Sequence, residues 1–473
     1  MKIALAHYHL RSGGVTSVVL HQARALRDAG DEVLIITGEK PPEDPGIPLV
    51  LIEGLQYDQI RNPLPQDSTD FSDSAANLAG AISAAMESHW GSPADILHVH
   101  NPLIRKNRSL IPALKLLQKR GIRLLLQNHD LAEDFRPDVY TGEAYPENCH
   151  YGVINSRDYS FLHRAGLKTA GLHLIPNEVF PMEAAGGLER TRYLYPVRGI
   201  RRKNIGEALF FSLFIPKGRT VALTLPPTTE RDLGVYRRWI ALAQALRLPV
   251  EFEVGMKKSF SETLGSSLCV ITTSIKEGFG FSFLEPWTAG RAVLGRRLDV
   301  CRDFEDAGVV FDSLYNSINI PTVYISPGQF YKKMEQTLAA VFHTFGLAIP
   351  DYLIGRMGEE FLNRETLDFG SMDEEFQENI IRTLISNSVV REEIIAANPF
   401  LAALPDWKPD EDLIETNRRV ILEKYSRERI LEILRDTYRQ VLGTPVSHKI
   451  QKTLLLELYL DPLRFSLVGV SRD

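Results

Sequence analysis

Two glutamates that stand eight positions apart are the residues of this chain with the most evident chemistry. Glu277 and Glu285 enclose the turn Gly278-Phe279-Gly280. Glycines let a ligand approach the backbone closely, and a helix that begins after Gly280 would present unpaired N–H groups and the positive end of its dipole. Carboxylates on both sides of such a phosphate cradle can accept hydrogen bonds from hydroxyl groups. The pattern therefore predicts a ligand with a sugar, a diphosphate and a ribose.

A second charged segment lies at residues 197–204, where four cations stand in one short loop before an expected helix. Cationic side chains stabilise the charge that develops on a diphosphate leaving group, so Arg198 and Lys203 are candidates for that role. Arg201 and Arg202 are weaker candidates. The alternative interpretation is a solvated basic loop.

The segment from Glu277 to Glu285 resembles the E-x7-E signature of retaining, family-4-type glycosyltransferases. The similarity continues at Gly290 and at residues 292–295, and it covers about residues 1–345 and, more loosely, the C-terminal helices. The resemblance implies an α/β fold with two facing Rossmann-like domains, called GT-B, and a C-terminal helical segment. One residue departs from the family pattern, because Val197 stands where a glycine usually precedes the arginine.

The resemblance also implies a reaction. A hexose of the glucose or mannose type would pass from a nucleoside-diphosphate sugar to an acceptor hydroxyl, with the α configuration retained. Glu277 would orient the sugar hydroxyls, Glu285 the ribose, and Arg198 with Lys203 the diphosphate. The leaving diphosphate would help to deprotonate the acceptor, and neither a cofactor nor a metal ion would be needed.

Residues in the first half of the chain complete the predicted site. The family resemblance assigns His129 to the donor sugar near C6 and Gly14 to a glycine loop near the ligand. It assigns His100 and Asn101 to a loop beside the acceptor, and Asp130, which directly follows His129, is a further candidate for the acceptor pocket.

Lys106 belongs to a basic stretch at residues 105–123 that contains seven cations and no acid. Such a stretch favours an anionic acceptor, with Lys106 as a contact, or a peripheral membrane contact. A solvated helix face is the alternative.

The histidines require a second hypothesis to be weighed. His98 and His100 share one face of an expected strand, and His129 and Asp130 follow the next one. Together they could form a zinc site. No His-Glu-x-x-His or Cys partner accompanies them, so the assignment to a sugar site is preferred.

The elements that position these residues follow a βαβ pattern. Apolar runs predict strands at 2–7, 32–37, 96–100, 124–127, 220–225, 250–254 and 268–272. Helical periodicity predicts helices at 16–29, 75–87, 110–120, 205–211 and 233–246. We expect an acceptor domain at residues 1–180, a donor domain at 181–372, and a helical extension at 373–473 that packs back on the domains. Specificity is expected in loops such as 55–72 and 140–149.

Length and composition limit the classes of protein to which this chain can belong. A length of 473 residues indicates more than one domain, and a net charge of −6 argues against nucleic acid as a partner. The three cysteines are unclustered, which is typical of a reducing cytoplasm. We expect no signal peptide, and no segment approaches the roughly 18–20 apolar residues of a membrane span.

Two other functions stay open at this point. One is a phosphorylase, hydrolase or epimerase on the same scaffold, and the other is a non-catalytic sugar-nucleotide-binding protein. An intact acid pair together with a basic loop favours the transferase, because a sensor has less need of Arg198 and Lys203 together.

Overall fold

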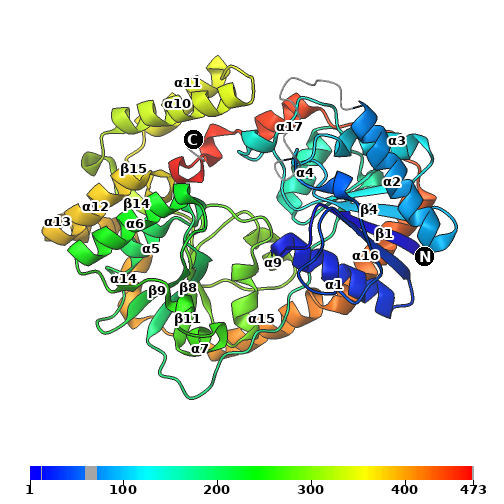
Figure 1. The fold of residues 1–473 in the computed structure, drawn as a ribbon. Coiled ribbons are helices and arrows are strands. Elements are labelled where there is room, and N and C mark those ends of the chain that lie inside the picture. The colour runs from blue at the N-terminus through cyan, green and yellow to red at the C-terminus, as the bar shows by residue number, and fades with distance from the viewer. Residues whose placement is uncertain (12, 59–71, 471–473) are drawn as a thin grey trace. The chain divides into compact units, whose positions relative to one another are not determined.

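The computed structural model describes residues 1–11, 13–58 and 72–470 (Figure 1). Contacts divide the chain into two compact units. Unit 1 comprises Met1–Glu178 and Tyr425–Tyr459, and unit 2 comprises Val179–Lys424 and Leu460–Asp473. Residues 373–473, expected as one extension, are therefore divided between the two units. Residues 59–71 of the first expected specificity loop lie outside the described residues.

Unit 1 is built on a parallel sheet with the strand order β3-β2-β1-β4-β5-β6-β7. The strands are β1 Lys2–His7, β2 Glu32–Thr37, β3 Leu49–Leu51, β4 Ile96–His100, β5 Leu124–Asn128, β6 His150–Val153 and β7 Leu172–Leu174. The central strands β1, β4 and β5 are almost completely buried, as expected for a parallel sheet that is covered on both faces.

Helices cover both faces of this sheet. The helices are α1 Gly14–Asp28, α2 Ser72–Trp90, α3 Leu110–Lys119, α4 Ser156–Arg164, α16 Arg427–Gly443 and α17 Lys452–Tyr459. Alternate strand residues serve opposite cores, because successive side chains point to opposite faces. Ile3, Leu5 and Ile96 pack with α1 and α16, whereas Ala4, Ala6 and Leu97 pack with α2, α3 and α17. Figure 1 shows the orange helix α16 beside the blue helix α1, and Arg427 of α16 pairs with Asp28 of α1.

Unit 2 contains a second parallel sheet, with the order β10-β9-β8-β11-β12-β13. Its strands are β8 Arg192–Arg198, β9 Thr220–Leu225, β10 Val250–Glu251, β11 Ser267–Thr272, β12 Val293–Arg296 and β13 Leu314–Tyr315. A separate antiparallel pair consists of β14 Asn319–Pro321 and β15 Thr366–Asp368.

The helices of unit 2 follow the strands and then continue as a helical series. They are α5 Ile205–Phe211, α6 Glu230–Ala245, α7 Phe260–Gly265, α8 Glu285–Thr288, α9 Cys301–Asp306, α10 Pro327–Thr344, α11 Asp351–Leu362, α12 Glu374–Ser386, α13 Ser388–Ala397, α14 Pro399–Ala403 and α15 Glu411–Lys424. None of the helices in the described ranges is long and apolar enough to span a membrane.

The predicted α/β class is confirmed, since each unit is a parallel, Rossmann-like sheet with covering helices. Most predicted strands and helices are confirmed with small shifts at their ends. The strand expected at 250–254 covers only Val250–Glu251. The central strand β8 was not predicted, because Pro196 and the flanking arginines interrupt its apolar pattern.

Candidate active site

Glu277, which is predicted to bind the sugar, lies in unit 2 on the segment that follows β11. Its carboxylate is paired with two cations. The Nζ atom of Lys203 donates to Oε1 of Glu277. Arg202 Nη1 lies 3.5 Å from the other carboxylate oxygen. The side chain of Glu277 is 11% exposed and that of Lys203 is 14% exposed, so this is a largely desolvated ion pair.

Local hydrogen bonds hold Lys203 and Glu277 in this arrangement. Lys203 ends a 3-10 turn, Arg201–Lys203, between β8 and α5. Tyr195 of β8 donates its hydroxyl to the carbonyl of Lys203 at 2.7 Å and lies 2.9 Å from the hydroxyl of Ser274. The hydroxyl of Thr273 also donates to the carbonyl of Lys203, at 3.1 Å. The cationic turn and the segment after β11 are thus tied together through buried hydroxyl groups.

The pKa values of the pair reflect two opposed effects. Burial disfavours the charged form of Glu277, but Lys203 and Arg202 outweigh burial and lower the pKa of Glu277 below its ordinary value. Burial also lowers the pKa of Lys203, although the neighbouring Glu277 opposes this shift. We expect both groups to be charged at neutral pH, because each stabilises the charge of the other.

The other two predicted cations of this loop lie elsewhere. Arg198 ends β8 with an exposed side chain, and its Nη1 donates to the carbonyl of Pro226 at 3.4 Å. The guanidinium of Arg201 binds both oxygens of Glu374 and the carbonyl of Val470. Arg201 is therefore engaged in structural contacts, whereas Arg198 is accessible to a ligand.

The glycine turn has the conformation that its residue types predict. Gly280 has φ +94°, and a Cβ atom there would approach Val300 and Phe283 at 3.1 and 3.2 Å. Only glycine adopts this conformation in this space without strain. Phe279 is buried and packs edge to face on Phe304, with ring centroids 5.7 Å apart.

The prediction of a helix that begins directly after Gly280 was wrong about where the helix starts. The segment forms a 3-10 turn, Phe281–Phe283, and α8 then begins at Glu285 and has four residues. Pro286 favours a helix start there, because proline suits the first turn and removes an N–H that would lack a partner. Glu285 is thus the first residue of a short helix.

Glu285 is a partly buried carboxyl group for which the described residues provide no hydrogen-bond partner to its side chain. Burial raises its pKa to about 7. A carboxyl group in such surroundings is available for a ligand, and its charge changes near neutral pH.

Four buried imidazoles form a row in unit 1, along the second half of β4 and at the carboxyl ends of β1 and β5. This histidine row consists of His7, His98, His100 and His129. All of them lie on the sheet face that α1 and α16 cover, since they keep the register of Ile3, Ile96 and Leu125. The rings of His98 and His100 stack at 4.3 Å, and His98 Nδ1 lies 2.9 Å from the hydroxyl of Tyr438.

The predicted residues His100, Asn101, His129 and Asp130 lie together. His100 Nδ1 is 3.1 Å from His129 Nε2. Asn101 has φ +54°, and its Oδ1 accepts hydrogen bonds from the backbone N–H of His129 at 2.6 Å and of Asp130 at 3.2 Å. Asn101 therefore joins the ends of β4 and β5.

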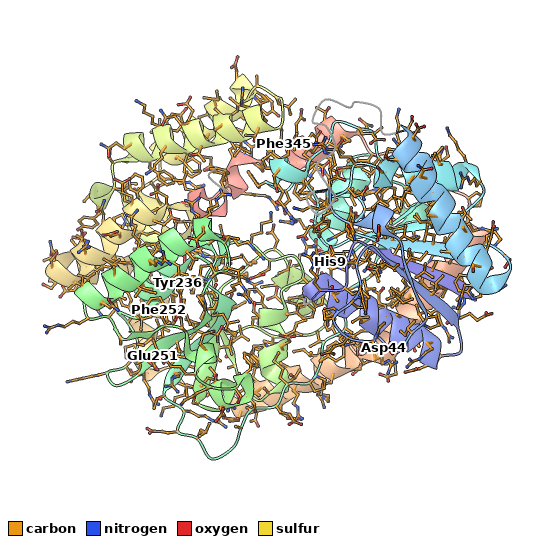
Figure 2. The ribbon with its side chains drawn as sticks, viewed as in Figure 1. His9, Asp44, Tyr236, Glu251, Phe252 and Phe345 are labelled. Carbon is orange, nitrogen blue, oxygen red and sulfur yellow. The ribbon has the colours of Figure 1, made fainter. Side chains whose placement is uncertain are left out.

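A second group at the same edge of the sheet was only partly predicted. We call this group the edge cluster: His9, Tyr57, Lys106, Asp130 and Arg136. Figure 2 shows His9 on the segment between β1 and α1, and its Nε2 lies 3.1 Å from the hydroxyl of Tyr57. Lys106 Nζ lies 5.7 Å from the centre of the Tyr57 ring.

The charges of the edge cluster influence one another. Arg136 Nη1 pairs with Asp130 at 3.3 Å. Burial and the neighbouring Arg136 lower the pKa of Lys106, and Asp138 opposes this shift. His9 and Tyr57 were missed in the sequence, although the His-Tyr-His run at the end of the first strand was a usable signal for His9.

Gly14 is the first residue of α1, and a Cβ atom there would meet no neighbour within 4 Å. Its position at the start of α1, shortly after β1, is the one predicted, but the structure does not require glycine there for space. Among the residues that the structure describes, no group of three or more His, Cys, Asp or Glu side chains is arranged to hold a metal ion. The zinc hypothesis for the histidines therefore has no support.

Comparisons with known proteins agree with these observations. Residues 13–180 match the model of a glycosyl transferase 4-like domain. A relative, the mannosylglucosyl-3-phosphoglycerate synthase of Petrotoga mobilis, is 26% identical over 367 residues, which cover 70% of each chain.

Solved structures share the fold. Sucrose-phosphate synthase from Thermosynechococcus elongatus has a TM-score of 0.53 at 17% identity, over 93% of this chain and 99% of that one. The Anabaena protein HepE, solved with UDP and glucose, has a TM-score of 0.53 at 13% identity, again over 93% and 99%. The domain match at residues 13–180 and the relative support a family-4-like glycosyltransferase, and the solved structures share its two-domain GT-B fold.

Proposed function

We propose that the protein transfers a hexose of the glucose or mannose type from a nucleoside-diphosphate sugar to an acceptor hydroxyl, with the α configuration retained. The observation that carries this proposal is the desolvated ion pair of Lys203 with Glu277, the residue directly before the glycine turn. A buried carboxylate beside a cation suits a ligand that joins hydroxyl groups to a diphosphate. The solved HepE structure with UDP and glucose supports a sugar nucleotide as the donor class.

In the proposed reaction, the bond between C1 of the sugar and the phosphate oxygen breaks while a bond from C1 to the acceptor oxygen forms on the same face. The acceptor proton passes to the leaving diphosphate, so that the products are a glycoside and a nucleoside diphosphate. Lys203 and Arg198 stabilise the charge that grows on the diphosphate. Glu277 orients the sugar hydroxyls, Glu285 the ribose, and His129 the sugar near C6.

We also propose that transfer needs no added metal ion. Lys203 and Arg202 already lie beside Glu277, and the exposed Arg198 adds a third cation from the end of β8. Cations on side chains can neutralise a diphosphate in place of Mg²⁺.

The acceptor is proposed to carry a phosphate or carboxylate group. The edge cluster offers an ammonium on Lys106, a guanidinium on Arg136 and a hydroxyl on Tyr57, all of which can donate hydrogen bonds to an anion. The Petrotoga relative is named for a product with a phosphoglycerate part. We therefore expect sugar phosphates and phosphoglycerate derivatives to be better acceptors than neutral sugars.

The test begins with the donor. Thermal unfolding is measured with UDP, GDP and ADP sugars of glucose and mannose in the presence of EDTA. A ligand at about 100 times its dissociation constant adds about 2.7 kcal/mol to the free energy of unfolding, which gives a measurable shift. The selected donor is then incubated with anionic and neutral acceptors, and glycoside and free nucleotide are quantified.

Each rival function predicts a different result in this assay. Stoichiometric glycoside and nucleoside diphosphate support the transferase. Nucleotide release without glycoside indicates a hydrolase, consumption of free phosphate indicates a phosphorylase, and a shift with no turnover indicates a binding protein.

A further inference from the structure

The contact between His100 and His129 restricts the position of the ring protons in the candidate site. The two rings are nearly parallel, with an interplanar angle of 16°, and His100 Nδ1 lies 3.1 Å from His129 Nε2. One of these nitrogens must carry the proton that the other accepts, because a neutral imidazole has one donor and one acceptor nitrogen.

Both imidazoles are neutral at the pH of the cell. His100 is completely buried and His129 is 6% exposed. Burial lowers the pKa of His100 well below its ordinary value, and that of His129 to about 4. Each ring therefore holds a single proton, and the hydrogen bond between them has only two arrangements.

The surroundings of His100 distinguish these arrangements. Its Nε2 atom is buried and has no hydrogen-bond partner in the described part of the chain. If His129 donated to His100, then His100 Nε2 would carry an N–H without an acceptor. If His100 donates, the same atom carries only an unused lone pair. A buried N–H without a partner is rarer in proteins than an acceptor whose capacity is not filled.

We propose that His100 is a positioning residue that donates from Nδ1 and thereby holds His129 in the Nδ1–H form. His129 then presents an N–H group to an oxygen of the transferred sugar. None of the described residues binds Nδ1 of His129, whereas Asn101 fixes its backbone N–H. The backbone and the ring proton of His129 are thus both set before a ligand arrives. This inference rests on the proposed function of His129 in sugar binding.

The first test is nitrogen NMR of the full-length protein labelled in histidine, with the His129 ring assigned by its loss in His129→Asn. The expected result is a protonated Nδ1 and an unprotonated Nε2 in the unmodified protein. In His100→Leu, which removes the donor, nothing holds His129 in the Nδ1–H form, and its ring nitrogens should show a mixture of the two tautomers. A protonated Nε2 of His129 in the unmodified protein would overturn the proposal.

Kinetics supply the second test. His100→Leu should lower kcat/KM for the sugar nucleotide about tenfold, the value of one hydrogen bond. His100→Asn keeps an amide donor near the place of Nδ1 and should stay within about threefold of the unmodified protein. His98→Leu is the matched control, since His98 is equally buried in the same strand and pairs with Tyr438 instead of His129.

Both leucine variants are expected to lower the melting temperature, but only His100→Leu should lower kcat/KM. Equal losses of kcat/KM in both variants would mean that His100 serves the fold alone, which contradicts the proposal. Full transfer by His129→Ala would overturn the sugar contact and leave the NMR assignment intact. The failure of the proposed function and the failure of the tautomer assignment are therefore distinguishable.

Discussion

Burial raises the pKa of Glu285 to about 7, so the charge of this carboxyl group changes within the pH range of a binding assay. If its carboxylate accepts hydrogen bonds from the ribose hydroxyls, the sugar nucleotide binds best to the ionised form. The apparent dissociation constant then grows in inverse proportion to the ionised fraction. For a pKa of about 7, that fraction falls about tenfold between pH 8 and pH 6.

Calorimetric titration of an intact sugar nucleotide is the assay, because its diphosphate is esterified at both ends and does not titrate in this range. The affinity of the unmodified protein should fall about tenfold from pH 8 to pH 6. Glu285→Gln should lose about 1–2 kcal/mol of binding at pH 8 and show a flat profile, since it lacks the charge. The histidine row does not interfere, because burial holds the pKa of His129 at about 4 and those of His7 and His98 at about 3.

Two results would refute this reasoning. A flat profile in the unmodified protein would mean that the charge of Glu285 does not matter for the donor. The same pH dependence in Glu285→Gln would assign the titration to another group.

Three further predictions concern charge. Arg198→Ala should lower kcat by on the order of 100-fold with little change in stability. The control Arg302→Ala, at an exposed arginine, should change neither kcat nor stability. Equal kcat values in the two variants would show that Arg198 has no role in the reaction. Lys203→Met should reduce the free energy of unfolding, measured by chemical denaturation, by about 3 kcal/mol, because it leaves Glu277 buried without Lys203. Adding Glu277→Gln to this variant should restore part of that stability. No loss of stability in the single variant would contradict the desolvated pair. The histidine row is neutral in the fold and has depressed pKa values, so its stability contribution is complete above pH 6.5 and declines as the pH falls. The loss at pH 5 should be about 2 kcal/mol for each of His7, His98 and His129. A melting temperature that does not change between pH 7 and pH 5 would show that these imidazoles are not held neutral.

The sequence predicted the elements whose patterns are local. Continuous apolar runs identified β1, β4, β5 and β11, and the glycines after β11 predicted a turn that the φ angle of Gly280 confirms. The strand β8 could not be recognised, because Pro196 and its arginines disguise a buried central strand. Its burial depends on neighbours that are distant in the sequence.

The same distinction holds for the candidate site. The spacing of the four cations in residues 197–204 does not tell which of them reaches a ligand. Glu374, 173 positions away, binds Arg201, while Glu277, 74 positions away, binds Lys203. Likewise, Tyr438 pairs with His98 only because α16 returns to unit 1. Partners brought by tertiary structure, and not the local pattern, separate the structural cations from those available for chemistry.

The most direct test of the central claim is the configuration of the product. The donor selected by thermal unfolding is incubated with an anionic acceptor, and proton NMR records the anomeric signal of the glycoside product. Retaining transfer predicts an α-glycoside and one nucleoside diphosphate for each glycoside formed. A β-glycoside, or nucleotide release without any glycoside, would contradict the account.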